Sequence, residues 1–289
     1  QPHSSFTYRY PITHSGTYWY HSHTGLQEQQ GIYGALVFHP EKEKIKADKD
    51  HVIVLSDWID APPETVLANI KKDGDYYALK KQSVQSWAGV LKNGQMAINK
   101  RLHSAWTRMG PMDSSDIGYD LFLANGQKES FLKAASGEKI RLRLVNAGAS
   151  SYFNVEFSGG PMTIVAADGV DVEPLVVKRL QIATAETYDV IVQIPESKSY
   201  ELRSTSVFIG QGDKVFAPNI PKPNLFLMSP MMMDGMKSMQ SMSGMSKKMH
   251  GNHKMSFQNN DQSSYHYTNY DRLRAVKETN FSEDLPKRQ

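Results

Sequence analysis

The feature that most constrains this chain is a succession of short runs rich in β-branched and aromatic residues, each bounded by Pro, Gly or Ser. Such runs are typical of β-strands. The expected strands cover residues 5–10, 16–23, 34–38, 51–56, 119–124, 139–146, 153–157, 162–166, 179–182, 188–194 and 200–204. So many short strands at this spacing predict an all-β fold built from closed or sandwiched Greek-key barrels.

One segment, from about residue 63 to residue 108, departs from the strand pattern. Its apolar residues, among them Val66, Ile70 and Trp87, recur at helical intervals, and turn signals such as Asn93-Gly94 separate them. We therefore predict a helical insertion that decorates a β domain.

The composition excludes several classes of protein. The chain has no cysteine, which excludes disulfides, a thiolate nucleophile and zinc-finger sites. Its net charge is only +3, with basic and acidic residues interleaved, so nothing supports nucleic-acid binding. Because no run of about 18 apolar residues is present, we expect no membrane span. The chain starts at Gln1 without the features of a signal peptide, so we expect either a processed N-terminus or a piece of a longer chain.

A pair of histidines, His21 and His23, stands at the end of an aromatic run. Successive side chains of a strand point to opposite faces, so these two side chains should point the same way. Two neutral imidazoles on one face can bind copper or zinc together. We expect the pair to project toward an interdomain surface rather than into a barrel core. The alternative is a pair of partly exposed strand histidines without a metal.

The surrounding residues favour the metal site. The run from Ser15 to Val37 closely resembles the second histidine motif of multicopper oxidases, in particular of the bacterial copper-resistance protein A branch. This resemblance implies that His21 and His23 each bind one copper of the type 3 pair, within the trinuclear cluster where dioxygen is reduced. Copper is therefore the expected cofactor. The glycines of the run, which allow a tight loop and a close backbone approach, are Gly25, Gly31 and Gly34.

Other stretches resemble the middle cupredoxin-like domain of the same family, namely residues 54–58, 75–77, 162–174 and 185–190. In the family pattern these residues bind no copper. Three acidic residues within them are expected to form turns or cap strands rather than to take part in catalysis: Asp168, Asp171 and Glu186.

The resemblance covers nearly the whole chain and implies its domain organisation. Residues 1–40 would be the C-terminal part of a first cupredoxin-like domain, and residues 41–222 a complete second domain that carries the helical insertion. Residues 223–264 would be a flexible linker rich in methionine and histidine, and residues 265–289 the start of a third cupredoxin-like domain.

Ten of the fourteen methionines lie between Met228 and Met255. Thioether sulfur is soft and uncharged, and it therefore favours Cu(I) over harder ions. The intervening Gly, Ser and Lys residues argue against a hydrophobic helix face. We expect a flexible loop that collects Cu(I), with an inert linker as the alternative. Its candidate ligands are Met233, Met236, Met239, Met242, Met245, Met249, His250 and His253. The other histidines, expected to be surface or structural residues, are His3, His14, His39, His51, His103 and His266.

The function that the resemblance implies is the oxidation of Cu(I) to Cu(II) in the periplasm, with four-electron reduction of dioxygen to water. The expected partners are Cu(I), dioxygen and the remaining cupredoxin domains. A complete enzyme of the family has four His-x-His motifs and a type 1 copper bound through cysteine, whereas this chain has one such motif and no cysteine. We therefore expect the chain alone to be neither blue nor active. The alternatives are a laccase-like phenol oxidase and a non-enzymatic periplasmic protein that sequesters copper.

Overall fold

The structure is a computed structural model, and it describes residues 3–72, 76–82, 84–107, 117–219, 268 and 270–277. The chain divides into two compact units. The first unit comprises Gln1–Asp60, Tyr119–Pro218 and Tyr267–Gln289, and the second comprises Ala61–Gly118 and Asn219–His266. All the strands that the structure describes belong to the first unit, and the three α-helices it describes belong to the second.

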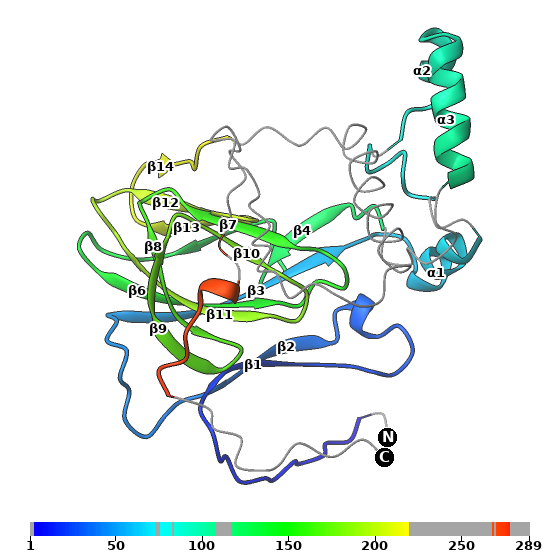
Figure 1. Cartoon of the computed structure of the whole chain (residues 1–289). Coiled ribbons are helices and arrows are strands. Elements are labelled where there is room, and N and C mark those ends of the chain that lie inside the picture. Colours follow the sequence, from blue (N-terminus) through cyan, green and yellow to red (C-terminus); the bar gives the residue numbers. More distant parts are fainter. Residues whose placement is uncertain are drawn as a thin grey trace, which may run out of the picture. The chain divides into compact units, whose positions relative to one another are not determined.

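Two six-stranded sheets form the body of the first unit and lie face to face (Figure 1). One sheet has the order β4-β3-β6-β11-β8-β9, and the other has the order β10-β7-β12-β13-β5 with β14 paired to β12. The strands of the first sheet are β3 (Lys49–Trp58), β4 (Leu121–Ala124), β6 (Lys139–Asn146), β8 (Met162–Ala167), β9 (Val170–Val177) and β11 (Thr187–Gln193). Those of the second are β5 (Glu129–Leu132), β7 (Phe153–Phe157), β10 (Arg179–Ile182), β12 (Ser199–Arg203), β13 (Ser206–Gly210) and β14 (Lys214–Val215). The predicted all-β sandwich is confirmed.

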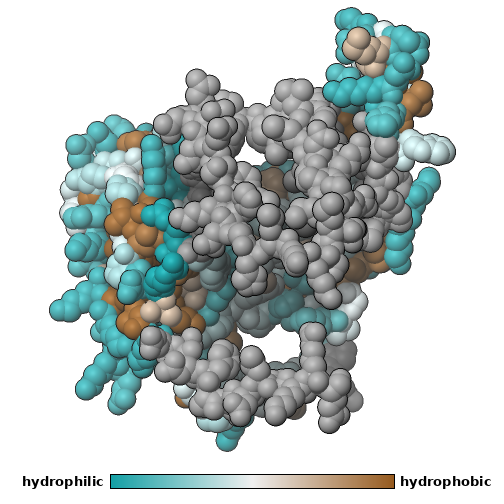
Figure 2. Space-filling model, in the orientation of Figure 1, coloured by the Kyte–Doolittle hydropathy of each residue, from teal (hydrophilic) through white to brown (hydrophobic). Residues whose placement is uncertain are grey.

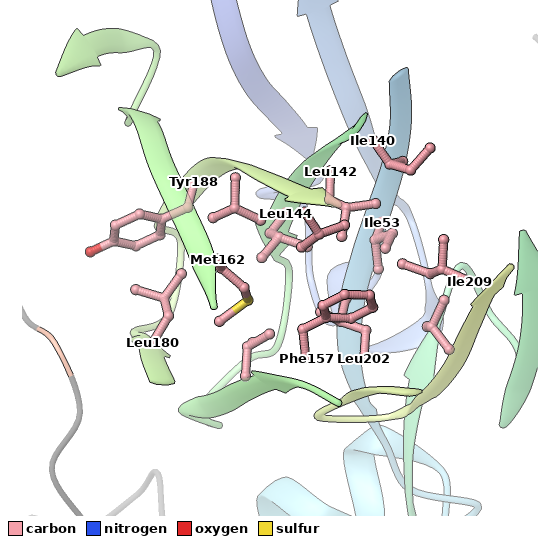
Figure 3. Packing of buried hydrophobic residues seen from close by; sticks show 14 of the residues in the cluster. Ile53, Ile140, Leu142, Leu144, Phe157, Met162, Leu180, Tyr188, Leu202 and Ile209 are labelled. Atoms are coloured by element: carbon pink, nitrogen blue, oxygen red, sulfur yellow. The ribbon is translucent and has the colours of Figure 1, made fainter. Parts of the chain in front are cut away.

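Apolar residues of both sheets meet between them and form the core. Along β6, Ile140, Leu142 and Leu144 are fully buried. Figure 3 shows them in one cluster with Ile53 of β3 and Leu202 of β12. Because strand side chains alternate, the core takes every second residue of β6 and leaves the others on the outer face of the sheet.

A separate two-stranded sheet lies on that outer face. β1 (Gly16–His21) and β2 (Tyr33–Phe38) pair antiparallel along their whole length. β1 contacts β6 and β11. The Thr187 hydroxyl of β11 donates a hydrogen bond of 2.9 Å to the Thr17 carbonyl oxygen of β1. The strand that ends in the predicted histidine pair is therefore fixed on the sandwich.

The helices of the second unit are α1 (Pro63–Lys72), α2 (Trp87–Lys92) and α3 (Gln95–Thr107). The predicted helical segment is confirmed. Ser86 caps α2, since its hydroxyl oxygen accepts a hydrogen bond from the Gly89 nitrogen. Figure 2 shows α2 and α3 as mainly hydrophilic on the visible face, with isolated hydrophobic residues. In the part of the chain that the structure describes, no helix has the length and apolar character needed to cross a membrane.

Some strand predictions were wrong. Residues 5–10 form no strand, because no described segment pairs with them. β1 ends at His21 rather than at His23. β5, β9, β13 and β14 were not predicted from the sequence.

The segment after the Met-rich region returns to the sandwich. Thr268 pairs with Leu180 of β10, and Ala275 pairs with Val172 of β9, with η3 (Tyr270–Arg272) between them. The segment thus joins an edge of one sheet to an edge of the other.

Candidate metal centre

His21 is the last residue of β1, and His23 lies just beyond it, in the loop that leads to η1 (Glu28–Gln30). The Ser22 nitrogen donates a hydrogen bond of 3.0 Å to the Ile32 oxygen, which continues the pairing of the hairpin. Both histidines therefore lie where the chain turns from one strand of the hairpin to the other.

The loop after β1 is held by its own side chains and by two glycines. The Ser22 hydroxyl donates to Gln27 Oε1 over 2.7 Å. Gly31 ends η1 with a φ of 94°, a left-handed conformation that favours glycine. At Gly34, a Cβ atom would lie only 2.6 Å from Tyr20 Oη. The predicted tight loop with a close backbone approach is confirmed.

The two imidazole rings lie side by side. The centroids of the His21 and His23 rings are 4.4 Å apart, with 42° between the ring planes. Trp19, on the same face of β1, stacks on the His21 ring at 4.2 Å with an angle of 13°. His21 is partly buried and His23 is exposed. The two side chains thus point to one side, as the spacing predicts, and neither belongs to the hydrophobic core.

A carboxylate lies next to the His21 ring. Glu28 Oε2 is 3.2 Å from His21 Nδ1. That nitrogen is shielded from solvent and makes no hydrogen bond, so the carboxylate is within reach of it but is not aligned with it. An imidazole whose one nitrogen faces a carboxylate presents the other to a metal. Two imidazole rings close together, of which the His21 ring is partly buried, are a donor set that fits copper.

No group of three or more His, Cys, Asp or Glu side chains within the described ranges is placed to hold a metal ion. His14 lies before β1 and makes edge-on ring contacts with Tyr18 and Phe38. His51 lies in β3, and its Nε2 atom is buried without a hydrogen bond. His3, His39 and His103 are exposed, as are His14 and His23.

The predicted Cu(I) loop lies outside the described residues. Its candidate ligands are Met233, Met236, Met239, Met242, Met245, Met249, His250 and His253, and His266 also lies outside.

The three acidic residues in the stretches that resemble the middle cupredoxin-like domain were predicted to have structural roles. Asp168 adopts a φ of 46° in the turn between β8 and β9, and its Oδ1 accepts a 2.8 Å hydrogen bond from the Thr187 nitrogen. Glu186 Oε2 accepts a 2.7 Å bond from the Ala183 nitrogen. Burial raises the pKa of Glu186, the bond from Ala183 opposes this rise, and the charge of Asp168 adds to it. Asp171 is exposed on β9. Turn formation and capping therefore account for Asp168 and Glu186, whereas the Asp171 carboxylate forms an ion pair of 3.9 Å with Lys44.

A buried charge cluster fixes β1 to the sandwich. Asp189 of β11 is only 1% exposed. It accepts hydrogen bonds from Thr17 Oγ1 at 2.7 Å, Arg141 Nη2 at 2.6 Å and Arg143 Nη1 at 3.2 Å. Arg143 also donates to Asp50 of β3, through Nε at 2.8 Å and Nη2 at 2.7 Å. The opposite charges thus compensate one another, as buried charges must. Arg141 Nη1 makes no hydrogen bond but lies 3.1 Å from Glu43 Oε2.

The pKa of Arg143 reflects the opposing effects of burial and of the neighbouring carboxylates. Burial alone would lower the pKa of Arg143. The hydrogen bond to Asp50 and the charges of Asp189 and Asp50 outweigh it, so the pKa of Arg143 is raised overall. The guanidinium therefore stays charged in the cluster.

Sequence reasoning missed Trp19, Glu28 and the charge cluster. A signal existed for Trp19, because it shares a strand face with His21. For Glu28 the sequence held no signal, since the contact depends on how the loop closes. The cluster joins residues far apart in the chain, and no local pattern encodes it.

Two sequence models of known families match the chain, and both are described as Multicopper oxidase, one over residues 49–219 and the other over residues 1–43. Copper resistance protein A of Escherichia coli is 40% identical over 215 residues, which cover 72% of this chain and 35% of that protein. Copper resistance protein A of Pseudomonas syringae pv. tomato is 37% identical over 215 residues, with the same coverage of 72% and 35%. The chain thus spans about a third of the length of the curated relatives it matches.

Solved structures give the same result for the fold. Fet3p, a multicopper oxidase that functions in iron import, aligns with a TM-score of 0.51 at 17% identity, over 73% of this chain and 37% of that chain. A laccase from Botrytis aclada aligns with a TM-score of 0.50 at 22% identity, over 75% of this chain and 38% of that chain. At these identities the likeness concerns the fold alone, and it confirms the predicted cupredoxin-like architecture.

Proposed function

The chain belongs to the multicopper oxidase family, and we propose that it supplies two copper ligands, His21 and His23, to an enzyme of copper resistance. In this proposal the enzyme oxidises Cu(I) to Cu(II) and passes the electrons to dioxygen, which is reduced to water. The observation that carries the proposal is the placement of two imidazoles side by side at the end of β1, with centroids 4.4 Å apart.

Copper is the cofactor of this family, and when bound it supplies the electron-transfer chemistry. The residues of this chain bind and orient it. Trp19 stacks on His21 and limits the rotation of its ring. Thr17 is bonded to Asp189 of the sandwich, so the strand that presents His21 and His23 is held at its other end. A ligand pair carried by a supported strand needs little reorganisation when it takes up a metal.

Cu(I) is the substrate that two observations support. Two copper resistance proteins match over 72% of the chain at 40% and 37% identity, whereas a laccase matches over the same share at 29%. The tract from Met228 to Met255 offers many thioether groups, which prefer Cu(I) to Cu(II). The tract therefore favours a cuprous substrate over a phenol.

The proposal also includes location and partners. We infer a periplasmic protein in which further cupredoxin domains complete the copper sites, with dioxygen as the second substrate. In this arrangement residues 1–40 belong to a first domain, residues 41–222 form the second, residues 223–264 link it onward, and residues 265–289 begin the third.

Oxygen uptake tests the proposal. A copper-loaded protein that joins this chain to the remaining cupredoxin domains should consume dioxygen with Cu(I), using four Cu(I) ions for each dioxygen reduced to water. An oxygen electrode measures this uptake, with a phenol such as 2,6-dimethoxyphenol as the competing substrate. Faster uptake with the phenol would favour a laccase-like enzyme, and no uptake with either substrate would favour copper sequestration.

The methionine tract gives a second prediction. A peptide of residues 228–255 should bind Cu(I) several-fold more tightly than Cu(II), because its thioethers outnumber its imidazoles. Competition titrations with each oxidation state measure the two affinities. In a control peptide, leucine replaces Met233, Met236, Met239, Met242 and Met245, which removes five of the ten thioethers but keeps the apolar character and should weaken Cu(I) binding. Equal affinities for the two ions in the native peptide would rule out a Cu(I)-collecting role.

A further inference from the structure

We propose that Glu28 is the residue that positions His21, by accepting a hydrogen bond from its Nδ1–H group so that Nε2 is the nitrogen left for the metal. The inference rests on the proposed role of His21 as a copper ligand. Glu28 lies in a loop segment for which the sequence predicted no role.

The contact between the two side chains is the first observation. Glu28 Oε2 lies 3.2 Å from His21 Nδ1, and the two side chains are only 22% and 25% exposed. His21 Nδ1 makes no hydrogen bond. Because a buried ring nitrogen is unfavourable without a partner, the nearby carboxylate is the group to supply one. The last torsion of a glutamate is soft, so a small rotation of the carboxylate aligns the bond.

The loop holds Glu28 in this position. Glu28 begins η1, and its carbonyl oxygen accepts a 2.9 Å hydrogen bond from the Gly31 nitrogen. The Ser22 hydroxyl is bonded to Gln27, the residue before Glu28. The chain between His21 and Glu28 is therefore folded back on itself, which brings the carboxylate to the ring.

The role of Glu28 is to position the ring rather than to bind the metal. His21, His23 and Glu28 do not form a group that could hold one ion, since no such group of three exists among the described residues. A neutral imidazole carries one N–H, and a hydrogen bond at one nitrogen fixes which nitrogen is free. Trp19 already limits the tilt of the ring by stacking on it. Glu28 then selects the tautomer and increases the basicity of the nitrogen that faces the metal.

Nuclear magnetic resonance of the chain, labelled with ¹⁵N in its histidine rings, tests the inference. The metal-free chain reports the tautomer of His21, and a Zn²⁺ titration followed at the same ring reports the affinity at that site. Zn²⁺ is the probe because it is diamagnetic and binds imidazole well. Signals of His21 are assigned with His21→Ala, so that binding elsewhere in the chain does not contribute.

In the wild type we expect the tautomer with the proton on Nδ1. Glu28→Ala should shift the ring toward the other tautomer and weaken Zn²⁺ binding at His21 by about 10–100-fold. Glu28→Gln keeps an oxygen that can accept a hydrogen bond from Nδ1–H, and it should retain much of the tautomer preference and of the affinity. Gln29→Ala, an exposed neighbour in η1, should leave both unchanged.

Two results would overturn the inference. Either Glu28→Ala has the tautomer and affinity of the wild type, or Gln29→Ala weakens binding as much as Glu28→Ala does, which would indicate a general effect on the loop. Failure of the proposed function looks different, because His21 would then not respond to Zn²⁺ even in the wild type. The tautomers of the metal-free variants would still test Glu28 in that case.

Discussion

Replacing Asp189 by alanine is expected to lower the free energy of unfolding by about 3–5 kcal/mol. The change would leave two buried guanidinium groups, those of Arg141 and Arg143, without the carboxylate that both contact. It would also remove the acceptor of the Thr17 hydroxyl on β1. Urea unfolding followed by circular dichroism measures the loss. Because Thr17 ties the histidine strand to the sandwich, Zn²⁺ binding at His21 should weaken as well.

A surface ion pair of the same unit is the matched control. Glu196 and Lys198 are 2.8 Å apart, but their side chains are 66% and 47% exposed. Water already solvates both groups, so Glu196→Ala should leave the unfolding midpoint nearly unchanged. Similar losses of unfolding free energy in the two variants would show that burial of the charges does not explain how the cluster stabilises the fold.

The charge cluster also shows which part of the fold could not be predicted from the sequence. The strand at residues 139–146 was predicted, and its core residues follow the expected alternation. The same alternation would place Arg141 and Arg143 on a solvated face. They are buried instead, because β1 lies over them, and Thr17 is 126 residues away from Arg143 in the chain. A contact at that separation leaves no periodic pattern in the sequence.

The missed strand β9 has a local cause. Its sequence, Val170–Val177, contains acidic residues and Pro174, which lower strand propensity and remove a backbone donor. In the structure β9 is an edge strand of its sheet. A proline is tolerated there because the outer side of β9 pairs with no named strand and forms only the isolated bridge from Val172 to Ala275 among the described residues. The edge position depends on the arrangement of the whole sheet, and the strand itself does not reveal it.

For the candidate metal centre the sequence predicted two candidate ligands, but it did not predict the residues that contact them. The spacing of His21 and His23 was enough to predict that the rings face one side. The Met-rich loop was predicted from composition alone, and it remains a prediction. Glu28 reaches the ring only because Ser22 and Gln27 close the loop, and loop closure is a three-dimensional property.

The largest functional effect is expected at the histidine pair. In the copper-loaded protein that joins this chain to the remaining cupredoxin domains, His21→Ala and His23→Ala should each abolish oxygen reduction. Copper affinity depends on the number and geometry of the ligands, so a site that loses one imidazole is open to water and easily stripped. The blue colour should stay, because it arises from a type 1 copper bound through a thiolate, and this chain has no cysteine.

His14→Ala is the matched control for these two variants. His14 lies before β1 and packs on Tyr18 and Phe38, away from the pair, so its removal should leave oxygen uptake close to that of the wild type. An oxygen electrode, visible absorption and circular dichroism give the three readouts. Normal oxygen uptake by His21→Ala or His23→Ala would remove that residue from the ligand set. If the blue band disappeared while the circular dichroism spectrum stayed unchanged, the pair would belong to a different copper site, because only a change at the thiolate-bound copper removes that band.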